Sequence, residues 1–472
     1  MSFLRLKFTG MGRDSSRPIA VKLRKRGGML NMNSDRHESI HPMTIVTEIA
    51  KAMQVIFTDR ADELARETNF IKRERKLKGR HFAQALVFGW MSEGDARLET
   101  LSQSVANVSV DITRQGLHQR FTPEAATFLK AVLYESIAQV IKANQVDTSL
   151  LKRFGGVYVM DSTILVLPDK LASIWEGCTG SVLKISVCWE LLSGQLIAIH
   201  LHDAIEHDQQ APLQGMSLPE NSIRLADLGY FKLDVLEKYD REQVLWVTRY
   251  KVGTKLYDQA DHELDLLATL STQADDILDM SVQVGAKHKL GCRLVAQRIP
   301  PQKLKQRQDQ LRRWESRKQK QASALKWALL EWSIYLTNAT NDQLTGEEVM
   351  LMARVRWQIE LLFKLWKDVI DIDDWRSDHC WRILCEVYAK LIACIVQHWL
   401  MLVGGIHALD RSFTQASSVI QKWAWALAYS LTDHLQLTRY IAHLGKIMAT
   451  SCRISTSSSS LPTFQRIKQC IA

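Results

Sequence analysis

The spacing of apolar residues changes along the chain, and this change separates helical from strand-forming sequence. Between positions 44 and 150, apolar residues recur every three or four positions and glycine is scarce, which predicts helices. Between 151 and 250, short apolar runs alternate with turn-forming residues, which is typical of strands. After about position 371 the helical spacing returns. The sequence therefore predicts a strand-rich centre between helical regions.

The strand-rich centre has a defined order of elements. Val157–Met160 is a strand run that ends at Asp161, and Ile223–Ala226 is another that ends at Asp227. Two runs joined at Ser193-Gly194 predict a β-hairpin between them. The expected elements are, in order, Val157–Met160, Ser186–Leu192, Gln195–Leu201, Ile223–Ala226, a helix over Phe231–Tyr239, and Val244–Arg249. This order fits an α/β fold in which helices flank a mixed sheet.

The net charge of +10 indicates a polyanionic partner, and the clustering of the basic residues favours nucleic acid. The basic residues gather in the leader 1–43, in Ile71–Arg80, and in Arg298–Trp327, which we expect to be a long exposed helix. We expect the leader to be weakly ordered. It is a basic tail that can contact phosphates, a solvated leader, or an upstream extension with the true start at Met29 or Met32.

The cysteines and the longest apolar stretch indicate the compartment. None of the eight cysteines forms a CxxC pair or a zinc-site spacing with histidine, so we expect free thiols in a reducing cytosol. The stretch Leu391–Ile406 is interrupted by Gln397 and His398, which favours a buried helix over a membrane span. No signal peptide opens the chain. We therefore expect a cytoplasmic protein with no membrane partner.

Residues Leu101–Arg120 have the pattern of a helix, a break and a second helix. Asp111 or Thr113 can cap the second helix, which carries Arg114 and Arg120. This pattern is compatible with a DNA-binding helix-turn-helix, although any short polar helix before a proline has the same pattern. Arg114 and Arg120 are therefore candidate DNA contacts.

A helix expected over Leu351–Lys367 carries charged and apolar faces. Arg356, Glu360 and Lys367 lie close to the i, i+4 and i+7 positions that share one side of a helix. An apolar stripe runs beside them. On its own, this pattern is typical of an amphipathic surface helix with ion pairs.

The aspartates at the strand ends change this interpretation. Asp161 and Asp227 follow strands that we expect to be neighbours, and Glu360 lies on a helix that can pack over them. Three carboxylates with no nearby His or Cys favour Mg²⁺ or Mn²⁺. Two such ions stabilise the attacking and leaving oxygens of an in-line phosphoryl displacement. Arg356 and Lys367 are expected to bind phosphates beside the carboxylates.

A second acidic and histidine-rich segment follows the predicted hairpin. Its residues are His200, His202, Asp203, His207 and Asp208. We interpret them as exposed loop residues rather than as a metal site.

The three acidic motifs carry a family resemblance. Asp161-Ser162-Thr163 after a strand resembles the first acidic motif of DDE transposases, and Asp227-Leu228-Gly229-Tyr230 resembles the second. Arg356-Trp357-Gln358-Ile359-Glu360 with Lys367 is similar to the third. That motif is the Y-x2-R-x3-E-x6-K signature of the IS-four group of bacterial insertion sequences. The signature tyrosine falls on Ala353, and this is the one departure from the pattern.

The resemblance covers about Tyr158–Lys367, and two further segments are similar to the same group. These are Thr337-Asn338 and Leu461-Pro462-Thr463-Phe464-Gln465. The resemblance implies an RNase H-like core with a β-rich insertion between the second Asp and the Glu. The spacing agrees, because 133 positions separate Asp227 from Glu360.

The resemblance also implies an activity and its partners. It implies a cut-and-paste transposase that binds the inverted repeats of its element, pairs two DNA ends as a homodimer, and passes through a DNA hairpin. Asp161, Asp227 and Glu360 then bind two Mg²⁺ or Mn²⁺ ions. The expected phosphate or DNA contacts are Arg356, Lys367, Lys364, Arg249, Arg114 and Arg120. Trp327 and Trp332 are the candidates for stacking on a flipped base.

Two other functions stay open from sequence. An RNase H-like DNA nuclease without strand transfer has the same acids. A DNA-binding protein with a decayed catalytic site is conceivable because of Ala353.

These predictions divide the chain into six regions and place it in a bacterial cytoplasm, associated with the nucleoid. The regions are a basic leader (1–43), a helical DNA-binding region (44–150), the first part of the catalytic core (151–250), an insertion with a basic helix (251–336), the second part of the core with Glu360 (337–375), and a helical C-terminal region with a tail (376–472).

Overall fold

The computed structural model describes residues 42–73, 76–143, 149–178, 180–205, 211–405 and 411–454. All of them belong to the unit Ile40–Ala472. Several predictions fall outside the described residues. They concern the leader through residue 41, Glu74 and Arg75 of the basic run, His207, Asp208, and the serine-rich tail with the 461–465 motif.

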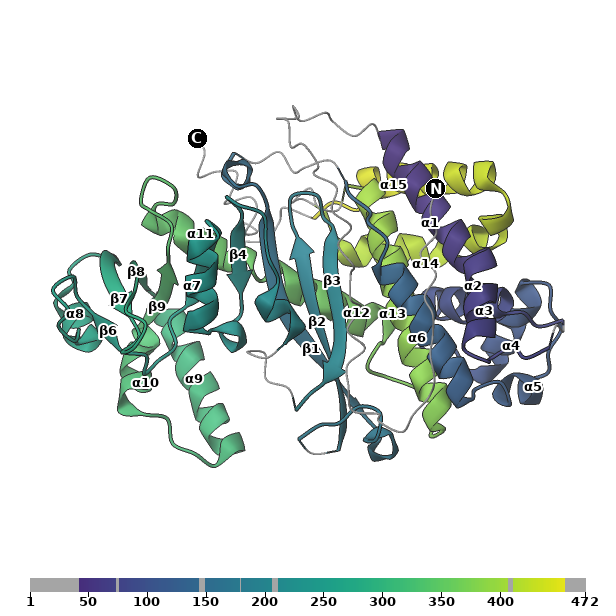
Figure 1. Ribbon diagram of the computed structural model, residues 1–472, viewed down its shortest axis with the longest axis horizontal. Helices are drawn as coiled ribbons and strands as arrows, with labels where there is room; N and C mark the ends of the chain where they lie inside the picture. Colours follow the sequence, from purple (N-terminus) through teal and green to yellow (C-terminus); the bar gives the residue numbers. More distant parts are fainter. Residues whose placement is uncertain are drawn as a thin grey trace. The chain divides into compact units, whose positions relative to one another are not determined.

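One mixed sheet organises the fold, and in the described part of the chain it contains nine strands in the order β3-β2-β1-β4-β5-β9-β8-β7-β6 (Figure 1). Their bounds are β1 Val157–Leu167, β2 Ser181–Glu190, β3 Leu196–Asp203, β4 Ile223–Ala226, β5 Leu245–Arg249, β6 Leu256–Tyr257, β7 Ile277–Val284, β8 Leu290–Arg298 and β9 Trp332–Thr337. In the first five strands, β1, β2 and β3 pair antiparallel, and β1, β4 and β5 pair parallel. This arrangement is RNase H-like and confirms the predicted α/β fold class.

Helices surround the sheet. They also form the parts of the chain that precede and follow the strand-rich centre in sequence. Their bounds are α1 Pro42–Val55, α2 Ala61–Glu67, α3 Gly79–Ser92, α4 Leu98–Asn107, α5 Arg114–His118, α6 Pro123–Ile137, α7 Leu233–Arg241, α8 Leu266–Thr272, α9 Pro301–Lys318, α10 Ala324–Ala328, α11 Gly346–Val355, α12 Gln358–Ile370, α13 Cys380–Val403, α14 Phe413–Tyr429 and α15 His434–Ser451. A π-helical turn, Ile56–Arg60, joins α1 to α2.

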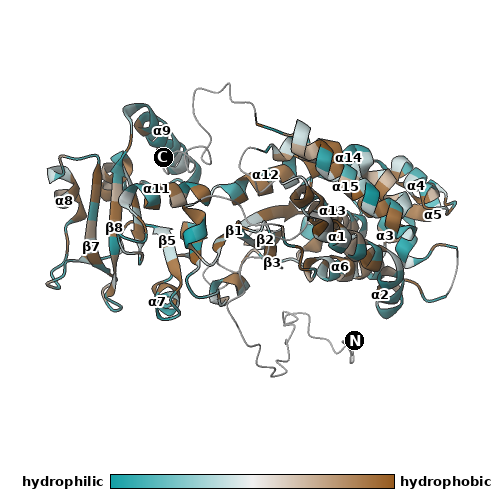
Figure 2. Ribbon diagram, turned by 90° about the horizontal axis from the view of Figure 1, so that it is seen from above, coloured by the Kyte–Doolittle hydropathy of each residue, from teal (hydrophilic) through white to brown (hydrophobic). Residues whose placement is uncertain are grey.

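Two hydrophobic cores form because successive strand residues point to opposite faces of the sheet. Val157 and Val159 of β1 pack into a core that contains α11, α12, α13 and the N-terminal helices. Tyr158 and Met160 pack into a second core with α7 and α8. Figure 2 shows apolar residues concentrated on α13, between the sheet and the other helices. The sheet is thus fixed on both faces.

Helix α13 is the one described helix that is long and apolar enough to cross a membrane, and its apolar stretch is wholly buried. This confirms the buried helix predicted over Leu391–Ile406. Two charged side chains lie inside it. Lys390 and Glu386, each 1% exposed, form an ion pair of 2.8 Å. The Lys390 ammonium also donates to the carbonyls of Asp371 and Asp374, at 2.9 and 2.8 Å, just beyond α12.

The segment between β5 and α11 extends the sheet. β9 pairs antiparallel with β5, and β8, β7 and β6 follow in turn. The basic helix here is shorter than predicted from Arg298–Trp327. α9 ends at Lys318 because Gln319 adopts a left-handed conformation with φ of 49°, and α10 begins only at Ala324.

Two predicted boundaries near the acidic motifs are wrong. Asp161 does not end a strand, because β1 stays paired with β2 from Tyr158 to Leu167. The single helix expected over Leu351–Lys367 breaks at Arg356 and Trp357. There the amides of Trp357, Ile359 and Glu360 bond to carbonyls three residues back, which tightens one turn and separates α11 from α12.

We expect Lys390→Ala to destabilise the protein by about 3–5 kcal/mol, because Glu386 is left buried without its ion pair. The measurement is chemical denaturation followed by circular dichroism. The exposed pair Arg376–Asp95 gives the matched control, since Arg376→Ala should cost at most about 1 kcal/mol. Equal effects of the two variants would contradict a structural role for the buried pair.

Candidate active site

Two parallel strands bring the aspartates together. Met160 of β1 pairs with Ala226 of β4, so the next residues, Asp161 and Asp227, occupy adjacent positions on neighbouring strands. The Ser162 amide donates to the Asp161 carboxylate at 2.8 Å. Asp227 begins a 3-10 turn, Leu228–Tyr230 (η6), and its side chain is half exposed. Asp161 is largely enclosed, with 14% of its side chain exposed.

Arg356 joins these aspartates to Glu360 of α12. Its Nη1 lies 3.1 Å from Asp161, and its Nη2 lies 2.5 Å from Glu360 and 4.0 Å from Asp227. One guanidinium therefore contacts all three predicted acids. The sequence predicted that the acids share a site, and it predicted an arginine beside them. It did not indicate that the arginine lies among them.

Burial and the neighbouring opposite charges shift the pKa values of Asp161 and Arg356 in opposite directions. Burial raises the pKa of Asp161 to about 6, with smaller contributions from Asp227 and Glu360, while the Ser162 amide and Arg356 oppose the rise. Burial alone lowers the pKa of Arg356, but the three carboxylates outweigh it and keep that pKa above its usual value. The guanidinium therefore stays charged and partly compensates the buried acids.

Lys367 lies about two helical turns beyond Glu360, along the charged side of α12. Its ammonium donates to the carbonyl of Ile164 on β1 at 3.1 Å and lies 3.3 Å from Asp373. Lys364 is largely exposed, 3.9 Å from Asp368. Arg249 is exposed at the end of β5, the strand beside β4. These three bases therefore lie on α12 or at the same edge of the sheet as the acids.

A buried chain of hydrogen bonds supports the turn after Asp227. The Tyr230 hydroxyl donates to Ser186 at 3.2 Å, and Ser186 lies 2.8 Å from Nε2 of His202. The interpretation of His200, His202 and Asp203 as exposed loop residues is wrong, because all three lie on β3 and His202 is buried. In the sequence, only the alternation of apolar and polar residues along β3 indicated that these side chains belong to a strand.

The remaining candidates lie elsewhere. Arg114 is on α5, a helix of only five residues, and it pairs with Glu99 of α4 at 2.6 Å. Arg120 follows the same helix, and Figures 1 and 2 draw α5 at the outer end of the helical region, away from β1. Trp332 is buried under the guanidinium of Arg298. Trp327 is half-buried, and its indole N–H donates to Glu315 at 3.2 Å.

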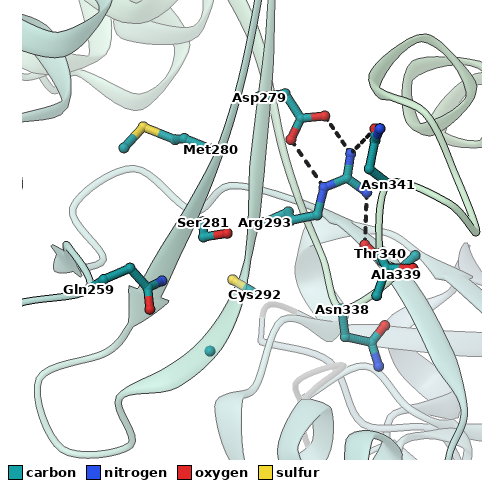
Figure 3. A pocket seen from close by; sticks show the side chains of 11 residues that line it. Gln259, Asp279, Met280, Ser281, Cys292, Arg293, Asn338, Ala339, Thr340 and Asn341 are labelled. Atoms are coloured by element: carbon teal, nitrogen blue, oxygen red, sulfur yellow. Dashed lines mark hydrogen bonds and ion pairs between the residues drawn. The ribbon is translucent and has the colours of Figure 1, made fainter.

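A cavity of about 670 Å³ lies apart from the acids (Figure 3). Arg293 of β8 closes one side of it and bonds to Asp279, Asn341 and the carbonyl of Ala339. Asn338, also in its lining, accepts from the amide of Trp246 near the start of β5, whereas Arg249 ends that strand. The cavity is therefore not part of the acidic site.

The donor set at the acidic site fits a hard divalent cation, since it consists of carboxylates with no thiol or imidazole. In the described ranges, no three His, Cys, Asp or Glu side chains form a group that could hold a metal ion as they stand. The reason is visible in the contacts of Arg356, whose guanidinium stands between the carboxylates.

Residues 152–396, just over half of the chain, match the family described as "Transposase DDE domain". The chain belongs to this family. It is therefore an enzyme that acts on DNA. The matched segment contains Asp161, Asp227 and Glu360, and it extends into α13.

Individual relatives agree with the family. The chain is 26% identical over 456 residues to the transposase for insertion sequence element IS231F of Bacillus thuringiensis subsp. israelensis, covering 90% of this chain and 94% of that one. It is 25% identical over 366 residues to the transposase for insertion sequence element IS1151 of Clostridium perfringens, covering 71% and 76%.

Among solved structures, the transposase is similar to the piggyBac transposase in a synaptic complex with hairpin DNA. The TM-score is 0.46, the sequence identity is 12%, and the match covers 87% of each chain.

We expect the Asp161 carboxyl to titrate near pH 6 in the metal-free transposase, and we expect Arg356→Gln to raise that pKa further. The folded state holds this proton more strongly than the unfolded chain does. The contribution of Asp161 to stability is therefore largest below pH about 4 and falls as the pH rises through about 6. NMR of ¹³C-labelled aspartate carboxyls measures the titration. An unchanged or lowered pKa in Arg356→Gln would contradict the assigned contact.

Proposed function

We propose that this transposase cuts and pastes its own insertion sequence, and that Asp161, Asp227 and Glu360 form its catalytic centre. It binds the terminal inverted repeats, pairs the two ends as a homodimer, cleaves the DNA, and joins the released ends to a target. The observation that carries this proposal is the meeting of all three acids at the guanidinium of Arg356, at the break between α11 and α12. The names of its relatives, transposases for insertion sequence elements, support the choice of substrate.

The three carboxylates are proposed to hold two Mg²⁺ or Mn²⁺ ions. When bound, the ions supply charge stabilisation for the attacking and leaving oxygens of phosphoryl transfer. Asp161 contributes an enclosed carboxylate that is fixed by the Ser162 amide. Asp227 and Glu360 contribute more exposed carboxylates, at 50% and 40% of their side chains, which can turn toward incoming DNA.

Arg356 and Lys367 are proposed to bind the DNA backbone at the site. The guanidinium has five donors in a planar fork, so it can bind a phosphate bidentately, and lysine acts as a point charge. A phosphate that attracts Arg356 away from the carboxylates also frees them to converge. Binding of the backbone and assembly of the acids are thereby coupled through one side chain.

The chemistry is proposed to run in four displacements at this one site. Water attacks a phosphate at the transposon end and breaks the bond to the 3′ oxygen. The released 3′-OH attacks the opposite strand, which forms a hairpin and breaks the bond to flanking DNA. Water then attacks the hairpin phosphate and releases the same 3′-OH. This 3′-OH attacks a phosphate of the target and breaks its bond to the 3′ oxygen of the target strand.

Other basic residues are proposed to extend the DNA path. Lys364 and Arg249 lie close enough to the acids to contact flanking phosphates. Arg114 and Arg120 serve more distant DNA, and the exposed bases of α9 add phosphate contacts. For a flipped base, Trp327 keeps part of its ring available, whereas Trp332 is 6% exposed.

We expect Asp161→Asn, Asp227→Asn and Glu360→Gln each to reduce cleavage by more than about 100-fold, since each removes a metal-binding charge. Binding to an inverted-repeat duplex, measured by gel shift, should persist. The matched control is Glu347→Gln on the exposed side of α11, which should cleave normally. Normal cleavage by any of the three variants would remove that acid from the site.

Strand transfer separates a transposase from a simple nuclease. Pre-cleaved ends with a 3′-OH, incubated with Mg²⁺ and supercoiled target DNA, should yield joined products. Ends that terminate in a 3′-deoxynucleotide should yield none, because the nucleophile is missing. Cleavage of target without any joining would favour the nuclease.

A further inference from the structure

Arg224 of β4 is a buried arginine that has no carboxylate beside it in the described part of the chain. Only 1% of its surface is exposed, and its Nε makes no hydrogen bond to any described residue. Burial lowers the pKa of Arg224, since a charged group is unfavourable in an apolar core without an opposite charge. An arginine at this place therefore needs a reason that packing alone does not give.

Gln214 connects Arg224 to the turn that follows Asp227. It belongs to a 3-10 turn, Pro212–Gly215 (η5), and it is 4% exposed. Its Oε1 accepts from Nη2 of Arg224 at 3.0 Å, and its Nε2 donates to the carbonyl of Tyr230 at 2.8 Å. The orientation of the amide follows from chemistry, because an arginine can only donate and a carbonyl can only accept. The two bonds thus link β4 to η6 through one buried side chain.

The backbone of Asp227 is what this link holds in place. The amide of Tyr230 donates to the carbonyl of Asp227 at 2.9 Å, and the carbonyl of the same Tyr230 accepts from Gln214. Among the described residues, none donates a hydrogen bond to the Asp227 carboxylate, which lies 4.0 Å from Nη2 of Arg356. The Asp161 carboxylate, in contrast, is fixed by the Ser162 amide. The position of the Asp227 carboxylate therefore depends on the turn that carries it.

We propose that Arg224 is a positioning residue for Asp227, because it holds Gln214 against the carbonyl of Tyr230 and so fixes the turn that presents the second carboxylate to the metal ions. This rests on the proposed function of the acids. Arg224 itself is buried and touches neither DNA nor metal.

The charge of Arg224 and the ring beneath it explain why an arginine serves here. A hydrogen bond from a charged donor is stronger than one between neutral groups, so it holds the Gln214 amide in one orientation. The guanidinium lies 5.2 Å from the ring centre of Tyr239 on α7, an arrangement that attracts a cation. The Tyr239 hydroxyl also donates to the carbonyl of Met216, directly after η5, at 2.8 Å. The turn that carries Gln214 is therefore attached to both β4 and α7.

The test measures binding of Mn²⁺ by the loss of its free-ion EPR signal. The sample is the full-length protein on a pre-cleaved transposon end that terminates in a 3′-deoxynucleotide and cannot react. Arg224→Met keeps the length and apolar bulk of the side chain and removes its donors. We expect it to weaken Mn²⁺ binding by about 10- to 100-fold, as removal of a group that orients a metal ligand does. The matched control is Leu270→Ala on α8, which disturbs the same core and should bind Mn²⁺ as the wild type does.

Gln214→Glu separates positioning from stability. The new carboxylate can pair with the buried Arg224, so the melting temperature should equal or exceed that of the wild type. The carboxylate cannot donate to the carbonyl of Tyr230, so Mn²⁺ binding should still weaken. A purely structural role for Arg224 and Gln214 predicts the opposite, namely Mn²⁺ binding that follows stability.

A double-mutant cycle decides whether Arg224 acts through Asp227. Asp227→Asn should weaken Mn²⁺ binding, and adding Arg224→Met to it should cause little further loss, because both changes affect one ligand. Losses that simply multiply would overturn the proposal, as would wild-type Mn²⁺ binding in both Arg224→Met and Gln214→Glu. Unaltered Mn²⁺ binding in Asp227→Asn alone would instead remove Asp227 from the proposed catalytic centre, so the two failures can be told apart.

Discussion

Three carboxylates that meet in a partly enclosed site repel one another, and the enclosed ones also lose hydration. Such a group depends on a positive charge placed among its members. Arg356 supplies this charge, because both ends of its guanidinium reach acids from three different elements. A lysine ammonium has a single charged atom and cannot span the same separation. The rest of the site can be understood as the means of holding this one side chain in place.

The scaffold does so by fixing α12 at its C-terminal end and along its length. Lys367 attaches the helix to β1 through the carbonyl of Ile164. Just past its C-terminus, the buried Lys390 holds the carbonyls of Asp371 and Asp374. The apolar side of α12 packs into the larger core with β1 and α13. A rigid helix on a central strand gives acids from distant parts of the sequence a fixed relative geometry.

The sequence was sufficient where local pattern and tertiary structure agree. Ile223–Ala226 has the predicted bounds, because turn residues follow the apolar run directly. Asp161 was misassigned because β1 continues past a polar residue. Asp161 pairs with a residue of β2 that is more than 20 positions away in sequence. A local run of apolar residues does not indicate such a pairing. The sequence likewise does not indicate the break between α11 and α12, since Arg356 and Trp357 keep helical dihedral angles.

The choice among 14 tryptophans is the clearest limit of pattern reasoning. Composition favours a core role for any one of them, and only burial identifies Trp357 as the exception. Its place directly after Arg356, at the break between α11 and α12, then puts it next to the residue that contacts the acids. The rise of about 1.5 Å per residue puts Lys364 about 10 Å from Trp357 along the helix axis. Helix geometry thus fixes such spacings from the sequence alone, whereas the exposure that distinguishes Trp357 comes from the tertiary structure.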